Sequence, residues 1–116
     1  MKPTVSMIIP AYNEEDHLKI TWEKTSAVLA KETADYEIII VNDGSIDQTA
    51  KIADNLALQD RHTRVIHNAG NKGFGFTCRE GIKAACMTFT GWISADTAWD
   101  PAVLKKVMGM LGQFGL

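Results

Sequence analysis

The sequence predicts an α/β protein, a three-layer α/β/α domain built on a mainly parallel sheet. Short apolar runs alternate with segments of helical periodicity along the 116 residues. This alternation is typical of a parallel sheet with helices on both faces. The loops after the apolar runs are rich in Asn, Asp, Gly and Ser, which favour turns and helix starts. We therefore expect the order βαβαβαβα in one domain, residues 1–116.

The first elements form one predicted βαβ unit. Residues 5–9 and 36–41 are apolar runs typical of buried strands. Between them, an amphipathic helix is predicted over about 15–32, because apolar positions recur with helical spacing at Leu18, Trp22, Thr25 and Leu29. After the second strand, Ser45 and Gln48 form a capping-box pattern, which predicts a helix that ends near Asp60.

The second half repeats this alternation. A strand is predicted at 64–67, followed by a glycine-rich connection and a helix with the apolar stripe Cys78, Ile82, Ala85 and Met87. Residues 88–93 read as a fourth strand. Asp100 and Pro101 are an N-cap followed by a first-turn proline. They open a last helix with the apolar positions Val103, Leu104, Val107 and Leu111.

Composition indicates an ordinary globular protein. Hydrophobic residues make up 46%, charged residues 22%, and the formal net charge is −2. This balance has no basic surplus, so we expect no nucleic-acid partner. No apolar stretch approaches the ~18 residues of a membrane span, and a cytoplasmic location is expected. Cys78 and Cys86 lack metal-site spacing and are predicted to be reduced thiols.

The polar loops carry residue types with distinct chemical uses. Asp43 has no charged partner in its own loop, and it can accept the N3–H of a uracil-like base whose face Tyr12 covers. Lys72, flanked by a glycine-rich loop, can neutralise a diphosphate. Asp96 can hold a divalent cation, Mg²⁺ or Mn²⁺, that bridges the same diphosphate. The predicted ligand is thus a nucleoside diphosphate derivative.

Three segments resemble the family 2 glycosyltransferases of the GT-A fold: residues 9–15, 41–49 and 71–75. The last, together with 79–82, is most similar to the polyprenyl-phosphate (dolichyl-phosphate mannose synthase-like) sugar transferases. The resemblance implies a Rossmann-like half-domain that binds a nucleotide-diphosphate sugar for transfer to an acceptor. The similarity to the polyprenyl-phosphate branch implies that this acceptor is a polyprenyl phosphate at a membrane. The residues assigned to nucleotide-sugar binding are Pro10, Ala11, Tyr12, Glu14, Asp43, Gly44, Ser45, Lys72, Gly73, Ser94 and Asp96.

The sequence departs from the family pattern after the fourth strand. The usual D-x-D motif is Ser94-Ala95-Asp96, so Asp96 is the one metal ligand expected, and Ser94 is expected to meet a ribose or a water instead. Ala98 replaces a frequent glutamine. The resemblance covers the amino-terminal, nucleotide-binding half of the family. We therefore expect a domain truncated on the acceptor side, with no catalytic base in this sequence. An uncovered apolar edge would then favour self-association.

Alternative readings remain open. The chain could be an inactive truncated homologue that serves as a binding or assembly module. A receiver-type signalling domain needs paired acids at the end of its first strand, and here the acids come after Tyr12. For residues 43–45 the plain alternative is a turn with a helix cap. The three histidines are expected at the surface and Trp22 in the core, while Trp99 is a better stacking candidate than Trp92.

Overall fold

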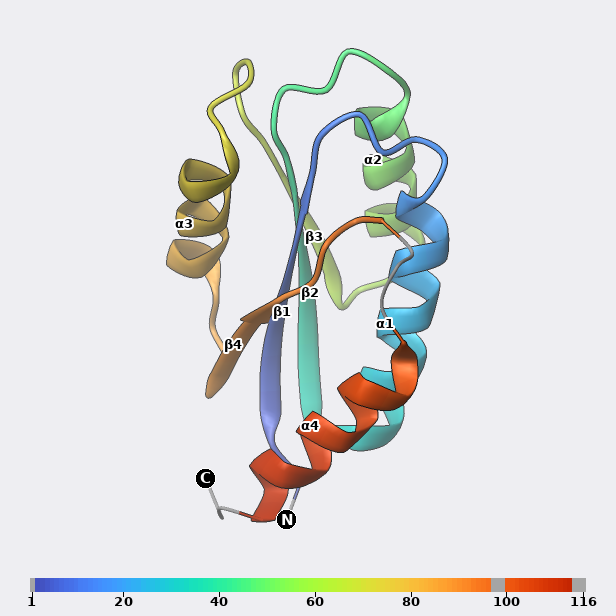
Figure 1. The fold of residues 1–116 in the computed structure, drawn as a ribbon, viewed down its shortest axis with the longest axis vertical. Helices are drawn as coiled ribbons and strands as arrows, with labels where there is room; N and C mark the ends of the chain where they lie inside the picture. The colour runs from blue at the N-terminus through green and yellow to red at the C-terminus, as the bar shows by residue number, and fades with distance from the viewer. Residues whose placement is uncertain (1, 97–99, 114–116) are drawn as a thin grey trace.

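The computed structural model describes residues 2–96 and 100–113. Its sheet has four parallel strands in the order β3-β2-β1-β4. The elements alternate as expected: β1 (Thr4–Ala11), α1 (Leu18–Glu32), β2 (Asp35–Asn42), α2 (Thr49–Gln59), β3 (Thr63–His67), α3 (Phe74–Ala84), β4 (Phe89–Trp92) and α4 (Pro101–Gln113). Figure 1 shows α3 on one face of the sheet and α1, α2 and α4 on the other. The predicted three-layer α/β fold is confirmed.

Both faces of the two central strands are buried. The main core contains Val5, Met7 and Ile9 of β1, packed with residues of α1, α2 and α4. Ile8 points to the opposite face and belongs to a smaller cluster with Ile39 and Val41. Successive side chains of a strand alternate between faces, so a strand covered on both sides is apolar at most of its positions. This explains the continuous apolar runs in the sequence.

Two helix starts differ from the sequence prediction. Helix α1 begins at Leu18 because the Glu14 carbonyl accepts the N–H groups of His17 and Leu18, which closes a turn before the helix. The capping box predicted for α2 is wrong. The Asp47 carboxylate accepts the Thr49 N–H at 2.9 Å at the start of α2, and the side chain of Gln48 makes no cap hydrogen bond.

Helix α3 packs through small residues and ends at Ala84, so of the apolar residues predicted for it, Ala85 and Met87 lie beyond its end. Thr77 and Gly81 are its buried residues, whereas Ile82 is 58% exposed. A Cβ atom on Gly81 would lie 2.6 Å from Cγ2 of Ile8. The helix thus lies too close to β1 for large side chains, and the sequence periodicity did not reveal this face.

The last helix begins as predicted. Asp100 Oδ1 accepts the Ala102 N–H at 2.9 Å, which is the expected cap. Leu104 and Met108 are buried, while Val103 is 61% exposed. Among the described residues, no helix is both long and apolar enough to cross a bilayer.

Candidate functional site

A small pocket lies where the carboxyl ends of β1 and β2 meet the loop after β3. These strand ends and loops are at the top of Figure 1. The volume of the pocket is about 220 Å³. Five predicted site residues lie in its wall: Pro10, Ala11, Tyr12, Asp43 and Gly73. The wall also contains three residues that were not predicted, Asn71, Phe74 and Thr77. The ends of parallel strands are the expected position for a ligand in an open α/β sheet.

Asp43 is held by the loop that follows β3. Its Oδ1 accepts the Asn68 side-chain amide at 2.9 Å and the Lys72 N–H at 2.7 Å, and its Oδ2 accepts the Gly73 N–H at 3.0 Å. These three donors come from another loop, and none of them is a charged group, so Asp43 has hydrogen-bond partners that the sequence did not reveal. Burial raises the pKa of Asp43, but the hydrogen bonds from Asn68, Lys72, Gly73 and Thr77 outweigh burial and hold the pKa below its usual value. Asp43 is thus a buried, ionised residue in the wall of the pocket.

Gly44 lets two loops touch through their backbones. Its φ of +69° lies in the left-handed region, and a Cβ there would lie 2.2 Å from the carbonyl carbon of Gly70. Only glycine can adopt this φ without strain and also leave room for the backbone of Gly70. Gly44 therefore does not line the pocket but fixes the loop that does.

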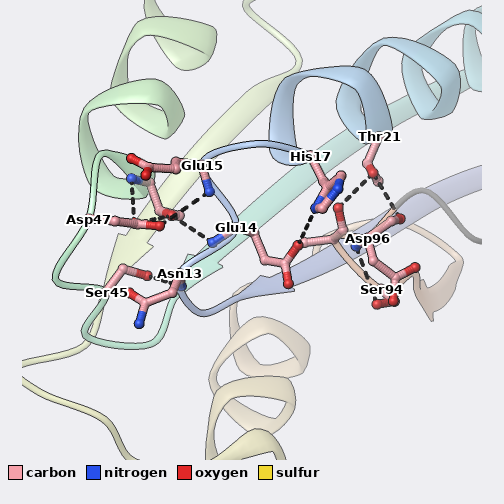
Figure 2. A network of polar contacts seen from close by, with 11 residues as sticks. Asn13, Glu14, Glu15, His17, Thr21, Ser45, Asp47, Ser94 and Asp96 are labelled. Atoms are coloured by element: carbon pink, nitrogen blue, oxygen red, sulfur yellow. Dashed lines mark hydrogen bonds and ion pairs between the residues drawn. The ribbon is translucent and has the colours of Figure 1, made fainter.

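The loops after β1 and β2 are joined by reciprocal hydrogen bonds (Figure 2). The Asn13 N–H donates to Ser45 Oγ, and the Ile46 N–H donates to Asn13 Oδ1, both at 2.9 Å. The Glu14 N–H donates to the buried Thr49 hydroxyl at 2.9 Å. Asn13 adopts a φ of 52°, which asparagine tolerates better than most residues. Ser45 thus connects the loops instead of facing the pocket.

Two further predicted residues, Glu14 and Lys72, do not line this pocket. The Glu14 carboxylate lies 3.3 Å from His17 Nδ1. Lys72 holds Asp43 through its backbone N–H, while the residue itself is exposed.

Ser94 and Asp96 form a second part of the candidate site, after β4. They line a larger, mainly apolar pocket of about 740 Å³ between β4 and α4. The buried Thr21 hydroxyl lies 2.7 Å from the Ala95 carbonyl oxygen and 3.0 Å from that of Asp96. In Figure 2, Glu14 and His17 lie between this segment and the loop that contains Ser45.

The donor set after β4 fits a cation that arrives with phosphate. In the parts of the chain that the structure describes, no group of three or more His, Cys, Asp or Glu side chains could hold a metal ion. Magnesium is commonly bound by one or two carboxylates together with substrate phosphates. Asp96 can supply such a carboxylate, whereas a site made entirely of protein ligands does not fit.

The structure describes two of the three tryptophans, Trp22 and Trp92. Trp92 is 55% exposed, and its ring meets Phe74 edge to face, with ring centroids 5.0 Å apart. Trp22 is partly buried against the main core and donates its Nε1–H to Thr63 Oγ1. Trp99 and Ala98 lie outside the described residues.

The family model of glycosyl transferase family 2 matches residues 6–115. The chain belongs to glycosyl transferase family 2. Among relatives, an uncharacterized glycosyltransferase, EpsJ of Bacillus subtilis, is 37% identical over 107 residues, covering 92% of this chain and 30% of EpsJ. The glycosyltransferase AglD of Haloferax volcanii is 31% identical over 108 residues, covering 90% of this chain and 17% of AglD. This family 2 chain therefore spans a third or less of the length of these relatives.

Solved structures share the fold at low sequence identity. S. aureus TarS 1-349 in complex with UDP-GlcNAc has a TM-score of 0.78 at 24% identity, covering 97% of this chain and 32% of that one. The mannosyltransferase PcManGT from Pyrobaculum calidifontis, in complex with GDP-Man and Mn²⁺, has a TM-score of 0.73 at 19% identity. There the match covers 90% of this chain and 31% of PcManGT. The four-stranded parallel unit is thus a GT-A fold.

Proposed function

We propose that this domain binds the nucleotide part of a nucleotide-diphosphate sugar and belongs to an enzyme that transfers the sugar. One observation carries the proposal: the ionised Asp43 carboxylate lies in the wall of a small pocket at the carboxyl ends of β1 and β2. Tyr12 and Phe74 supply aromatic surface in the same wall. A base can stack on such rings while its N–H donates to a carboxylate.

The diphosphate would extend from this pocket toward solvent. The Lys72 ammonium group is the cation that we assign to it. We assign Ser94 to the ribose or a bound water, and Asp96 to a divalent cation. That cation would neutralise charge on the leaving diphosphate. The Mn²⁺ in the PcManGT structure supports a divalent cation in this fold.

We further propose a polyprenyl phosphate as the acceptor. Support comes from the sequence of residues 71–75 and 79–82, which resembles the polyprenyl-phosphate branch of the family. The competing proposal is a module that binds the nucleotide but transfers nothing. Ser94, where the family has an acidic residue, favours this alternative.

Calorimetry with UDP and GDP, in Mn²⁺ and in EDTA, tests the binding proposal. Tyr12→Ala should weaken binding by about 1–3 kcal/mol, the scale of one stacked base. Asp43→Asn should cost about 1–3 kcal/mol through the loss of a charged acceptor. Asp16→Asn, in the exposed turn before α1, is the matched control and should leave the affinity unchanged. If the wild type binds neither nucleotide, the proposed function is wrong.

A transfer assay then separates the enzyme from the binding module. The 116-residue chain is mixed with UDP- or GDP-sugars and polyprenyl phosphate, and the glycolipid product is measured. Binding without product supports the module. Product formation supports the transferase and contradicts our expectation that this sequence lacks a catalytic base.

A further inference from the structure

We propose that Thr21 is a positioning residue, which holds the segment of Asp96 in place for the cation that accompanies the nucleotide. The inference rests on the proposed function, because it concerns the cation assigned there to Asp96. It adds a residue on α1 that no sequence motif indicated. The observation behind it is a hydrogen bond from the Thr21 side chain, on α1, to the main chain after β4.

The segment after β4 leaves the sheet early. Directly after the end of β4, the Ile93 N–H donates to the Ile8 carbonyl of β1 at 2.9 Å. Beyond this point the chain turns toward α1, as Figure 1 shows. The position of Asp96 therefore depends on contacts outside the sheet.

Thr21 supplies such a contact. Its hydroxyl donates to the Ala95 carbonyl at 2.7 Å, and the Asp96 carbonyl oxygen lies 3.0 Å away. A hydroxyl has one hydrogen, so the shorter contact to Ala95 is the main bond. The Ala95 side chain is 2% exposed and packs in the main core. Together these contacts fix the backbone on which the Asp96 carboxylate is mounted.

The residue type at position 21 argues for a specific role of the hydroxyl. Thr21 is fully buried on the face of α1 that also buries Leu18 and Leu29. A buried hydroxyl is unfavourable unless it is hydrogen-bonded, and valine would fill the same space without that requirement. The hydroxyl is thus useful at this position because it reaches the main chain of 95–96.

Thr25 provides a matched comparison on the same helix. It is equally buried, and its hydroxyl donates to the Thr21 carbonyl at 2.8 Å, within α1. Thr21→Val and Thr25→Val therefore remove the same group from the same face of the helix. Only the first change breaks the bond to the segment that contains Asp96.

The experiment measures UDP affinity by calorimetry with saturating Mn²⁺ and with EDTA. The ratio of the two affinities reports the contribution of the cation. Groups that orient a metal ligand typically change metal affinity by about 10–100-fold. We expect Thr21→Val to lower the ratio about tenfold or more, with unchanged affinity in EDTA. Thr25→Val should keep the wild-type ratio, and Thr21→Ser, which retains a hydroxyl, should restore it.

The outcomes separate this inference from the proposed function. The positioning role is wrong if Thr21→Val keeps the wild-type ratio of the two affinities. It is also wrong if Thr21→Ser lowers this ratio as much as Thr21→Val does. In both cases the proposal of nucleotide binding stands. If the UDP affinity of the wild type is the same in Mn²⁺ and in EDTA, both the proposed cation and the role of Thr21 are wrong. Thermal unfolding checks each variant. If Thr21→Val is unfolded, Thr21→Ser against Thr21→Ala gives the same comparison, with the ratio lost only in the alanine variant.

Discussion

A Cβ atom on Gly44 would lie 2.2 Å from the carbonyl carbon of Gly70, so the loops after β2 and β3 meet backbone to backbone. Asp43 directly precedes Gly44 in the loop after β2. Its carboxylate accepts the N–H groups of Lys72 and Gly73, which belong to the loop after β3. The close approach and the hydrogen bonds therefore hold the pocket wall in one conformation.

Gly44→Ala should disrupt this wall. The left-handed φ alone costs about 1–3 kcal/mol for a residue with a side chain, and the backbone clash adds to it. We expect a lower melting temperature and weaker UDP binding. Gly109→Ala is the control, because its added Cβ meets nothing within 4 Å inside α4. It should stabilise the protein by about 0.5–1 kcal/mol. Equal melting temperatures for the two variants would contradict the explanation.

Glu37 should make stability depend on pH. It is 7% exposed and accepts bonds from the Ser6 hydroxyl at 2.6 Å, the Cys86 N–H at 2.7 Å and the Arg64 guanidinium at 2.7 Å. Burial raises the pKa of Glu37, but these bonds outweigh it and hold the pKa below 4.5. Because the folded pKa is lowered, this stabilisation is present above the unfolded pKa. It is lost as the pH falls through the folded pKa.

Glu37→Gln tests this dependence. We expect a loss of about 1–3 kcal/mol near neutral pH, the scale of hydrogen bonds to a charged group. The difference from wild type should shrink on acidification below pH 4.5 in urea unfolding measurements. Glu23→Gln, on the exposed side of α1, should change little at any pH. A constant difference for Glu37→Gln across this range would contradict the linkage.

Asp96→Ala should abolish the gain in UDP affinity that Mn²⁺ provides. Asp96 is the carboxylate that the proposal assigns to the cation, and no larger set of metal ligands occurs among the described residues. Calorimetry in Mn²⁺ and EDTA measures the gain. Asp16→Ala, in the turn before α1, should retain it. A full Mn²⁺ effect in Asp96→Ala would exclude Asp96 as the ligand.

The isolated chain should self-associate through the pocket between β4 and α4. This pocket of about 740 Å³ is lined mainly by apolar residues, and Val103 in its wall is 61% exposed. Exposed apolar surface beside an edge strand favours association. Light scattering at micromolar concentration should detect oligomers that Val103→Lys weakens. Leu58→Lys, which replaces an 86% exposed leucine on α2, is the control. A compact wild-type monomer would refute the prediction.

The sequence by itself determined the order of the elements and the layered fold. Continuous apolar runs require strands covered on both faces, and helical spacing at residues such as Leu18 and Leu29 requires amphipathic helices. These patterns are local, so they can be read without knowing the partners. They also indicated that Tyr12 and Asp43 would meet, because neighbouring parallel strands end at the same edge. The structure places both in one pocket.

Only the tertiary structure decided which groups hold these residues in place. Asn68 and the backbone of Gly73 bind Asp43 from a loop more than twenty residues further along the chain. Thr21 reaches Ala95 across 74 positions in sequence. Such contacts depend on distances between elements, and residue spacing along one element carries no record of them. For the same reason, the sequence did not reveal that α3 packs against β1 through Gly81, since this close approach depends on how the two elements pack.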